Sequence, residues 1–165
     1  MTLMETMLYL GIAVFVMGAL FSYGWNMAGI SVKSSVIQET AAAAQSIDQA
    51  ITGEIRQAAS VDQDNSVFVG NPAKLVLKET DGSEVTIVAA DGQVTLQRGG
   101  SDTAALHSSE IRADNFMFTV QNSVAGDAEY VGFSFEAVAA YPGSVKQSSY
   151  QYSLPVRSGA SLRNH

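Results

Sequence analysis

The chain carries few of the side chains that perform chemistry in enzymes. It has no cysteine, which removes disulfides, thiolate catalysis and cysteine-ligated zinc together. Its two histidines are His107 and His165, and neither a Gly-x-Ser-x-Gly elbow nor a phosphate-binding glycine loop occurs. A lone histidine in a strand-rich segment is more often structural than catalytic. We therefore expect no enzyme activity, no catalytic residue and no cofactor.

One segment has the alternating side-chain oxygens that suit calcium, Asp62-Gln63-Asp64-Asn65. A calcium loop of the EF type needs glycine at its sixth position, where this chain has Val67. Asp48 and Glu54 are six residues apart, so they do not form a paired-carboxylate site on one helix face. We expect residues 62–65 to be a solvated loop and the chain to hold no metal.

Glu5 is the one charged side chain in an unusual place. It alone of the 9 basic and 16 acidic side chains precedes Lys33. A charge within hydrocarbon costs about 2.5–3.5 kcal/mol on insertion scales, and such a group usually has a partner. The cation available is an α-amino group, either that of Met1 in the same chain or that of a neighbouring chain. We favour the neighbour, because that pairing would set the register of an assembly.

The 27 residues that follow Glu5, 6–32, carry no charge. As a helix they would extend about 40 Å at ~1.5 Å per residue, more than a hydrocarbon core of about 30 Å requires. The run is too long for a cleaved signal peptide, and no Ala-x-Ala site follows it. We expect residues 1–32 to form an apolar transmembrane or filament-core helix.

Small residues within this run would allow neighbouring helices to approach closely. Gly18 and Gly24 are also places where the helix could loosen, because glycine lowers the cost of leaving helical geometry. Tyr9, Tyr23 and Trp25 suit either a membrane interface or a packed core.

The start Met1-Thr2-Leu3-x-Glu5, joined to the charge-free run, resembles the mature N-terminus of bacterial type IV pilins and type II secretion pseudopilins. In that superfamily a prepilin peptidase removes a short leader ending in glycine, the new terminus is N-methylated, and the helix packs into a filament core. The resemblance implies that Met1 is the processed and methylated terminus, that Thr2 and Leu3 flank the cleavage site, and that Glu5 is the assembly carboxylate. The sequence departs from many relatives in having no proline before Pro72, so helix melting in a filament would fall at the glycines.

From Lys33 onward the helical pattern turns amphipathic and predicts a continuation of the helix over 33–59. The apolar positions recur every three or four residues and are expected to face a folded body. They are Ile37, Ala41, Ala44, Ile47, Ile51, Ile55 and Ala58. The polar residues between them, Glu54 included, are expected to lie off this face.

Residues 60–165 are predicted to form a globular antiparallel β-sheet body. Strand patterns occur at 74–79, 84–89 and 93–97, and the turn signals Thr80-Asp81-Gly82-Ser83 and Asp91-Gly92 separate them. Three further strands are expected at 116–121, 130–139 and 149–156, with a flexible turn at 99–103. The predicted fold class is α+β: the apolar half of a long N-terminal helix extends outward and its amphipathic half packs on the sheet. The resemblance implies that this architecture is pilin-like.

The charge distribution limits the partners. Net charge is −7, and the basic residues are scattered singly, so no patch for nucleic acid is indicated. The resemblance implies a structural subunit of an extracellular type IV pilus that supports adhesion, twitching motility or surface contact. It implies as partners other copies of the chain, the prepilin peptidase and the inner-membrane assembly machinery, with the chain in the membrane before assembly and at the cell surface afterwards.

Two other interpretations stay open. One is a minor pilin or a type II secretion pseudopilin, which the run Glu54-Ile55-Arg56-Gln57-Ala58 resembles. The other belongs to a different class, a signal-anchored binding module that stays monomeric. A simple anchor has no need of Glu5, so that residue speaks against the module.

Overall fold

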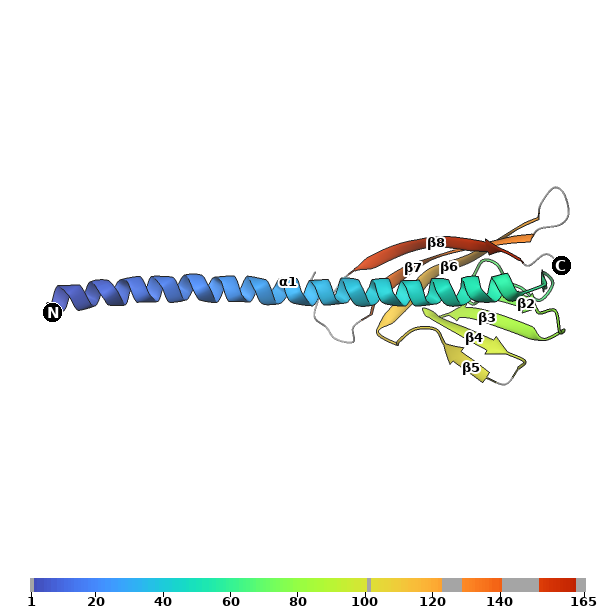
Figure 1. Cartoon of the computed structure of the whole chain (residues 1–165), viewed down its shortest axis with the longest axis horizontal. Coiled ribbons are helices and arrows are strands. Elements are labelled where there is room, and N and C mark those ends of the chain that lie inside the picture. The colour runs from blue at the N-terminus through green and yellow to red at the C-terminus, as the bar shows by residue number, and fades with distance from the viewer. Residues whose placement is uncertain (1, 101, 123–128, 141–151, 163–165) are drawn as a thin grey trace.

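The computed structural model describes residues 2–100, 102–122, 129–140 and 152–162, without the side chains of residues 26, 28, 29, 32, 102, 122 and 129. Within these residues a single helix, α1 (Leu3–Gln57), precedes the strands β1 to β8. Figure 1 shows α1 as a long rod with strands along its C-terminal half only. We call the strands, their connections and the part of α1 from Val36 onward the body. The α+β class and the exposed N-terminal apolar helix agree with the prediction.

The helix is uninterrupted over 55 residues, which is about 82 Å at ~1.5 Å per residue. It begins after the extended residue Thr2, and Glu5 lies in its first turn, where a carboxylate interacts favourably with the helix dipole. It ends because Ala58 adopts an extended backbone (φ −69°, ψ 142°). The Ala59 N–H then bonds to the Lys78 carbonyl at 2.8 Å. The start of this sheet pairing ends the helix two residues before the predicted position.

The first sheet is a meander of antiparallel strands in the order β1-β2-β3-β4-β5. Its strands are β1 (Ser60–Val61), β2 (Ala73–Lys78), β3 (Glu84–Ala90), β4 (Gln93–Arg98) and β5 (Asp102–Ala105). The three predicted strands are confirmed to within one residue at each end. The flexible turn predicted at 99–103 was too long, since β5 pairs with β4 from Asp102 onward.

The turn between β3 and β4 confirms the Asp-Gly signal. Asp91 and Gly92 have φ values of +52° and +79°, the two positive values that a type I′ hairpin turn requires. The Arg112 side chain crosses above this turn, and a Cβ atom at Gly92 would lie 2.7 Å from its Nε. Glycine is therefore required here both by its backbone angle and by the close approach of Arg112.

The second sheet contains β6 (Ile111–Asn122), β7 (Glu129–Ala139) and β8 (Ser153–Ser161), all antiparallel and in that order. A bulge in β6 between Asp114 and Met117 changes the inward parity, so Ala113 and then Phe116 are buried. Asn115 takes φ +55° at the bulge. Strand β6 begins five residues earlier than predicted. The bulge interrupts the alternation of inward and outward side chains, so one continuous alternating pattern does not describe the whole strand. Strand β8 also extends five residues further than predicted.

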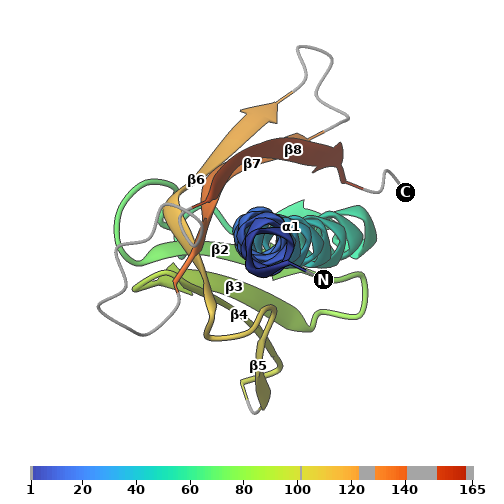
Figure 2. The same ribbon diagram turned by 90° about the vertical axis from the view of Figure 1, so that its left-hand side faces the viewer.

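The body therefore has two sheets rather than the single sheet that was expected. Figure 2 looks along α1 from its N-terminus and shows the helix between β7–β8 on one side and β2–β4 on the other. The sheets are joined through β6, whose Ala113 N–H bonds to the Gly92 carbonyl and whose Phe118 N–H bonds to the Phe68 carbonyl, each at 2.8 Å. Strand β6 pairs with β7 and not with β5, and this separates the two sheets.

The core fills the space between the helix and the sheets. Ile47, Ile51 and Ile55 of α1 are fully buried, and burying each such side chain stabilises the fold by about 1.5–3 kcal/mol. The second sheet contributes a cluster of four aromatic rings with centroids 5.0–6.4 Å apart, Phe116, Phe118, Phe133 and Phe135. Offset rings at such separations add to the stabilisation by burial.

The buried face of α1 starts at Val36, one residue before the predicted first position, Ile37. Val36 and Thr40 are buried, whereas Ile37 is half-buried and Ala41 is exposed. Thr40 can be buried because its hydroxyl donates to the Val36 carbonyl at 2.8 Å, which satisfies its polar atom within the helix. Small alanines on several faces left the phase of the pattern weakly specified.

Candidate functional site

The predicted site residues at the start of the chain form the first turn of α1. Glu5 is exposed, and its Oε2 accepts a hydrogen bond from the Thr2 backbone N–H at 3.4 Å. This is the reach-back contact of a capping box, and it satisfies one amide that the helix leaves without a partner. Leu3 is exposed. Met1, the expected site of processing and N-methylation, lies outside the described residues, so both possible amino-terminal partners of Glu5 remain untested.

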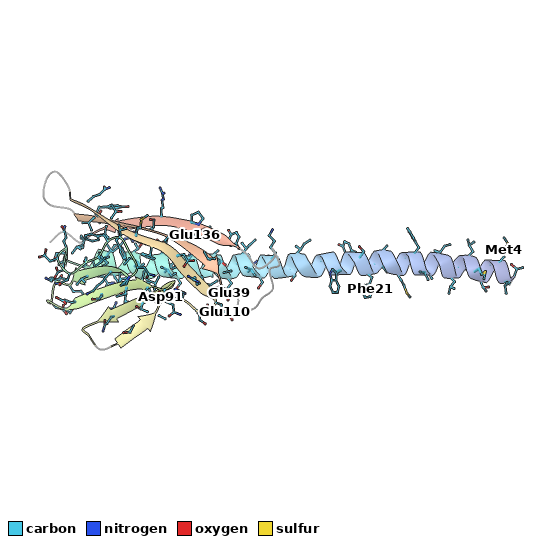
Figure 3. All side chains as sticks on the ribbon, turned by 180° about the vertical axis from the view of Figure 1, so that it is seen from behind. Met4, Phe21, Glu39, Asp91, Glu110 and Glu136 are labelled. Atoms are coloured by element: carbon cyan, nitrogen blue, oxygen red, sulfur yellow. The ribbon has the colours of Figure 1, made fainter. Side chains whose placement is uncertain are left out.

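The apolar segment (Leu3–Trp25) is exposed along its whole length. It is long and apolar enough to cross a membrane by length and composition, and none of it is buried. Phe15 and Trp25 are each 79% exposed. Figure 3 shows side chains such as Met4 and Phe21 projecting from the bare rod, while the labelled carboxylates lie on the body. Apolar surface of this extent marks a region that lipid or protein covers.

Gly18 and Gly24 lie within regular helix in this segment. A Cβ atom at either position would meet nothing within 4 Å. The fold of the single chain therefore does not require glycine at these positions. Helix loosening at Gly18 and Gly24 stays a prediction about an assembled state.

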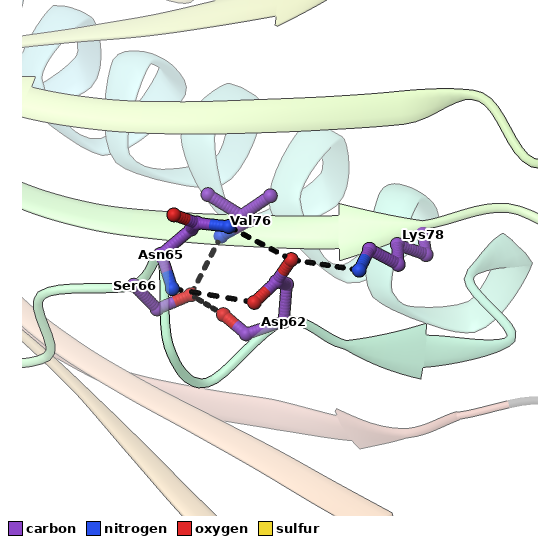
Figure 4. A network of polar contacts seen from close by, with 5 residues as sticks. All are labelled: Asp62, Asn65, Ser66, Val76 and Lys78. Carbon is purple, nitrogen blue, oxygen red and sulfur yellow. Dashed lines mark hydrogen bonds and ion pairs between the residues drawn. The ribbon is translucent and has the colours of Figure 1, made fainter.

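The acidic loop after α1 is held by its own side chains (Figure 4). Asp62 Oδ2 lies 2.7 Å from Lys78 Nζ and 3.0 Å from Asn65 Nδ2. The hydrogen bonds from Lys78 and then Asn65 lower the pKa of Asp62 from its ordinary 3.8 to about 2. The carboxylate is thus committed to a lysine, which disfavours calcium. Among the described residues, no three His, Cys, Asp or Glu side chains come together as metal ligands.

This ion pair predicts a pH dependence. Because the pKa of Asp62 is lower in the folded chain than in the unfolded chain, the pair stabilises the fold above pH 3.8 and loses this effect as the pH falls through about 2. Differential scanning calorimetry of Asp62→Asn in detergent should show a lower unfolding temperature than wild type at neutral pH. The difference should narrow below pH 3.8 and close near pH 2. A difference that does not change with pH, or an equal effect of the control Asp64→Asn, would contradict this.

The histidine that the structure describes, His107, makes backbone contacts. Its Nε2 accepts a hydrogen bond from the Val94 N–H at 3.1 Å, and its Nδ1 lies 2.8 Å from the Ser108 carbonyl oxygen. The ring thus continues the β4–β5 ladder at Val94, whose carbonyl accepts a backbone hydrogen bond from the Leu106 N–H at 2.9 Å. Both ring nitrogens are occupied in the fold of the body. His165 lies outside the described residues.

The sequence did not predict the ion pair between Arg98 and Glu54, whose carboxylate is buried. Glu54 was expected to lie off the buried face of the helix, but it is only 9% exposed and accepts a hydrogen bond from Arg98 Nη2 of β4. Its other oxygen, Oε2, is buried and has no hydrogen-bond partner among the residues that the structure describes. The pair connects the last turn of α1 to the first sheet. No local signal could have found it, because the two residues are 44 positions apart.

No protein-family model, curated protein or solved structure matches this chain. The features that bear on function are therefore the apolar segment, Glu5 at its start and the body at the other end of α1.

Proposed function

We propose that this chain is a structural subunit of an extracellular type IV pilus. It polymerises through α1 after a prepilin peptidase has processed its N-terminus. The observation that carries the proposal is the apolar segment, which is fully exposed in the single chain and has Glu5 as its only charged side chain. Exposed hydrocarbon on a rod of this length is covered by lipid before assembly and by other copies of the rod afterwards.

Glu5 favours assembly over simple anchoring. Lipid alone does not offset the free-energy cost of a carboxylate at the edge of the hydrocarbon. Such a group usually has a charged partner. Within its own chain, Glu5 uses one oxygen on the Thr2 N–H. In the proposed filament the same carboxylate meets the amino terminus of a neighbouring copy. A monomeric anchored module would carry the cost of Glu5 without this compensation.

The body suits a position outside the membrane. Every charged side chain except Glu5 and Lys33 follows Val36 in the sequence, and the chain has a net charge of −7. Mutual repulsion of such surfaces keeps bodies soluble and apart. In this proposal the bodies form the outer surface of the pilus, which supports adhesion, motility or surface contact. The inner-membrane assembly machinery and the prepilin peptidase act on the chain before export.

Two measurements test the proposal. A mass spectrum of the purified N-terminus should show N-methylated Met1, and a formyl-Met1 terminus would reject processing by a prepilin peptidase. Antibody-labelled electron microscopy of the producing cells should show long filaments made of this chain. A methylated terminus with labelling only at filament tips, or without long filaments, would favour a minor pilin or pseudopilin.

A further inference from the structure

A pocket in the body lies where the two sheets meet and has a volume of about 910 Å³. Its lining comes from residues 69–71 before β2, the β3–β4 hairpin around Asp91, residues 112–117 of β6 and Glu136 of β7. Figure 3 labels Asp91 and Glu136 on the body. No described residue of α1 contributes to the lining. Small-molecule sites are usually concavities of about 300–1,000 Å³, so this pocket has the size of a binding site.

The bulge of β6 brings two consecutive side chains to the pocket. In a regular strand, consecutive side chains point to opposite faces of the sheet. Asp114 and Asn115 are consecutive, yet both line the pocket, because Asn115 takes φ +55° at the bulge. Bulges often occur beside functional sites, where they redirect a side chain. The bulge thus supplies a carboxylate and an amide to the same place.

The polar side chains of the pocket include both hydrogen-bond donors and acceptors. Arg112 Nη2 donates to Asp114 Oδ1 at 3.0 Å, and Asn115 Nδ2 donates to Glu136 Oε2 at 3.5 Å. Asp114 and Glu136 are directly opposite in the pairing of β6 with β7, although like charges in this arrangement destabilise a sheet. A carboxylate can accept about four hydrogen bonds and a guanidinium can donate about five, so these groups retain capacity for a ligand.

Exposed apolar side chains form another part of the lining. Val69 is 67% exposed and Met117 is 45% exposed, and an isolated antiparallel bridge pairs the two residues. Among the described residues that follow α1, the other large apolar side chains with this degree of exposure are Val67 and Tyr130. Exposed apolar surface beside convergent polar groups is typical of a ligand site.

We infer that this pocket binds a neutral saccharide. A sugar hydroxyl both donates and accepts hydrogen bonds, so one sugar ring can pair with the amides, the guanidinium and the carboxylates together. The C–H face of the same ring can lie against Val69 and Met117. Binding needs no assembled filament, because a single chain supplies all of these groups.

Other classes of ligand match this lining less well. Three carboxylates and one guanidinium line the pocket, which disfavours an anion. An ammonium group only donates hydrogen bonds, so it would leave Arg112 and Asn115 without an acceptor on the ligand. Among the described residues, no three His, Cys, Asp or Glu side chains come together as metal ligands. A neutral ligand rich in hydroxyl groups fits the donors, the acceptors and the apolar side chains together.

A glycan array probed with the purified full-length chain tests this inference. The detergent must lack a sugar headgroup, since an alkyl glucoside or maltoside would compete for the pocket. An antibody then detects the chain bound to immobilised neutral, amino-sugar and sialylated glycans. We expect binding to neutral glycans. Binding to none of them, or only to the charged glycans, would overturn the inference.

Isothermal titration calorimetry with the neutral glycan that binds best then locates the sugar. Glu136→Gln should weaken binding at least about tenfold, because hydrogen bonds to charged groups are the stronger ones. Asn115→Gly should weaken binding at least about threefold, and glycine accepts φ +55° without strain, so the bulge is kept. The matched control, Glu110→Gln, changes an exposed residue outside the lining and should bind like wild type. Wild-type affinity in both pocket variants, or an equal loss in the control, would place the sugar elsewhere and contradict the inference.

Discussion

Glu5→Ala is expected to lower the filament yield at least about tenfold while the chain still enters the membrane and the body stays folded. In the proposed filament, the amino terminus of a neighbour would lose its carboxylate partner. An isolated buried cation is destabilising by about 3–5 kcal/mol, and 1.4 kcal/mol corresponds to about a factor of ten in an equilibrium constant. Glu5 is exposed in the single chain and lies in the part of α1 that precedes the body.

A second variant separates charge from capping. Glu5 also accepts the Thr2 N–H, so Glu5→Ala removes both a hydrogen bond at the helix start and a negative charge. Glu5→Gln keeps an oxygen that can accept this hydrogen bond and removes only the charge. If pairing with an amino terminus drives assembly, both variants should fail alike in immunoblots of sheared filaments. Filaments at the wild-type level from Glu5→Gln alone would show that Glu5 acts only as a helix cap. Abundant filaments from both variants would show that Glu5 has no role in assembly.

The parts of the fold that local patterns specify could be read from the sequence. The charge-free run and the four-residue spacing of Ile47, Ile51 and Ile55 define one long helix with a bare half and a packed half. Asp91-Gly92 defines a hairpin, because few other residue pairs accept two positive φ angles. These signals lie within a few residues of one another along the chain, so tertiary contacts did not override them.

The parts of the fold that depend on contacts between residues far apart in the chain could not be predicted from the sequence. Strand β5 has small, exposed side chains at residues 103–105, and pairing with β4 rather than burial makes it a strand. The bulge at Asn115 reverses the inward parity of β6, so no single alternation describes that strand.

Removing the guanidinium of Arg98 is expected to lower the stability of the body. Among the described residues, Arg98 is the ion-pair partner of Glu54, and the second carboxylate oxygen of Glu54 is buried without a partner. Arg98→Met should lower the free energy of unfolding by about 3 kcal/mol, because it leaves a buried carboxylate without a cation. The value is at the lower end for buried pairs, because the Arg98 side chain is 57% exposed and water can reach the vacated position.

The double variant Glu54→Met with Arg98→Met shows whether the loss comes from the stranded charge. Replacing both partners of a buried pair with apolar side chains is often neutral or stabilising, so the double variant should be more stable than Arg98→Met alone. Urea unfolding of the chain in detergent, followed by tyrosine near-ultraviolet circular dichroism, measures both differences without relying on Trp25, which lies outside the body. If Arg98→Met costs less than about 0.5 kcal/mol, in the range of exposed ion pairs, water must solvate Glu54. A double variant less stable than the single would instead show that packing around the helix end, rather than the unpaired charge, sets the cost.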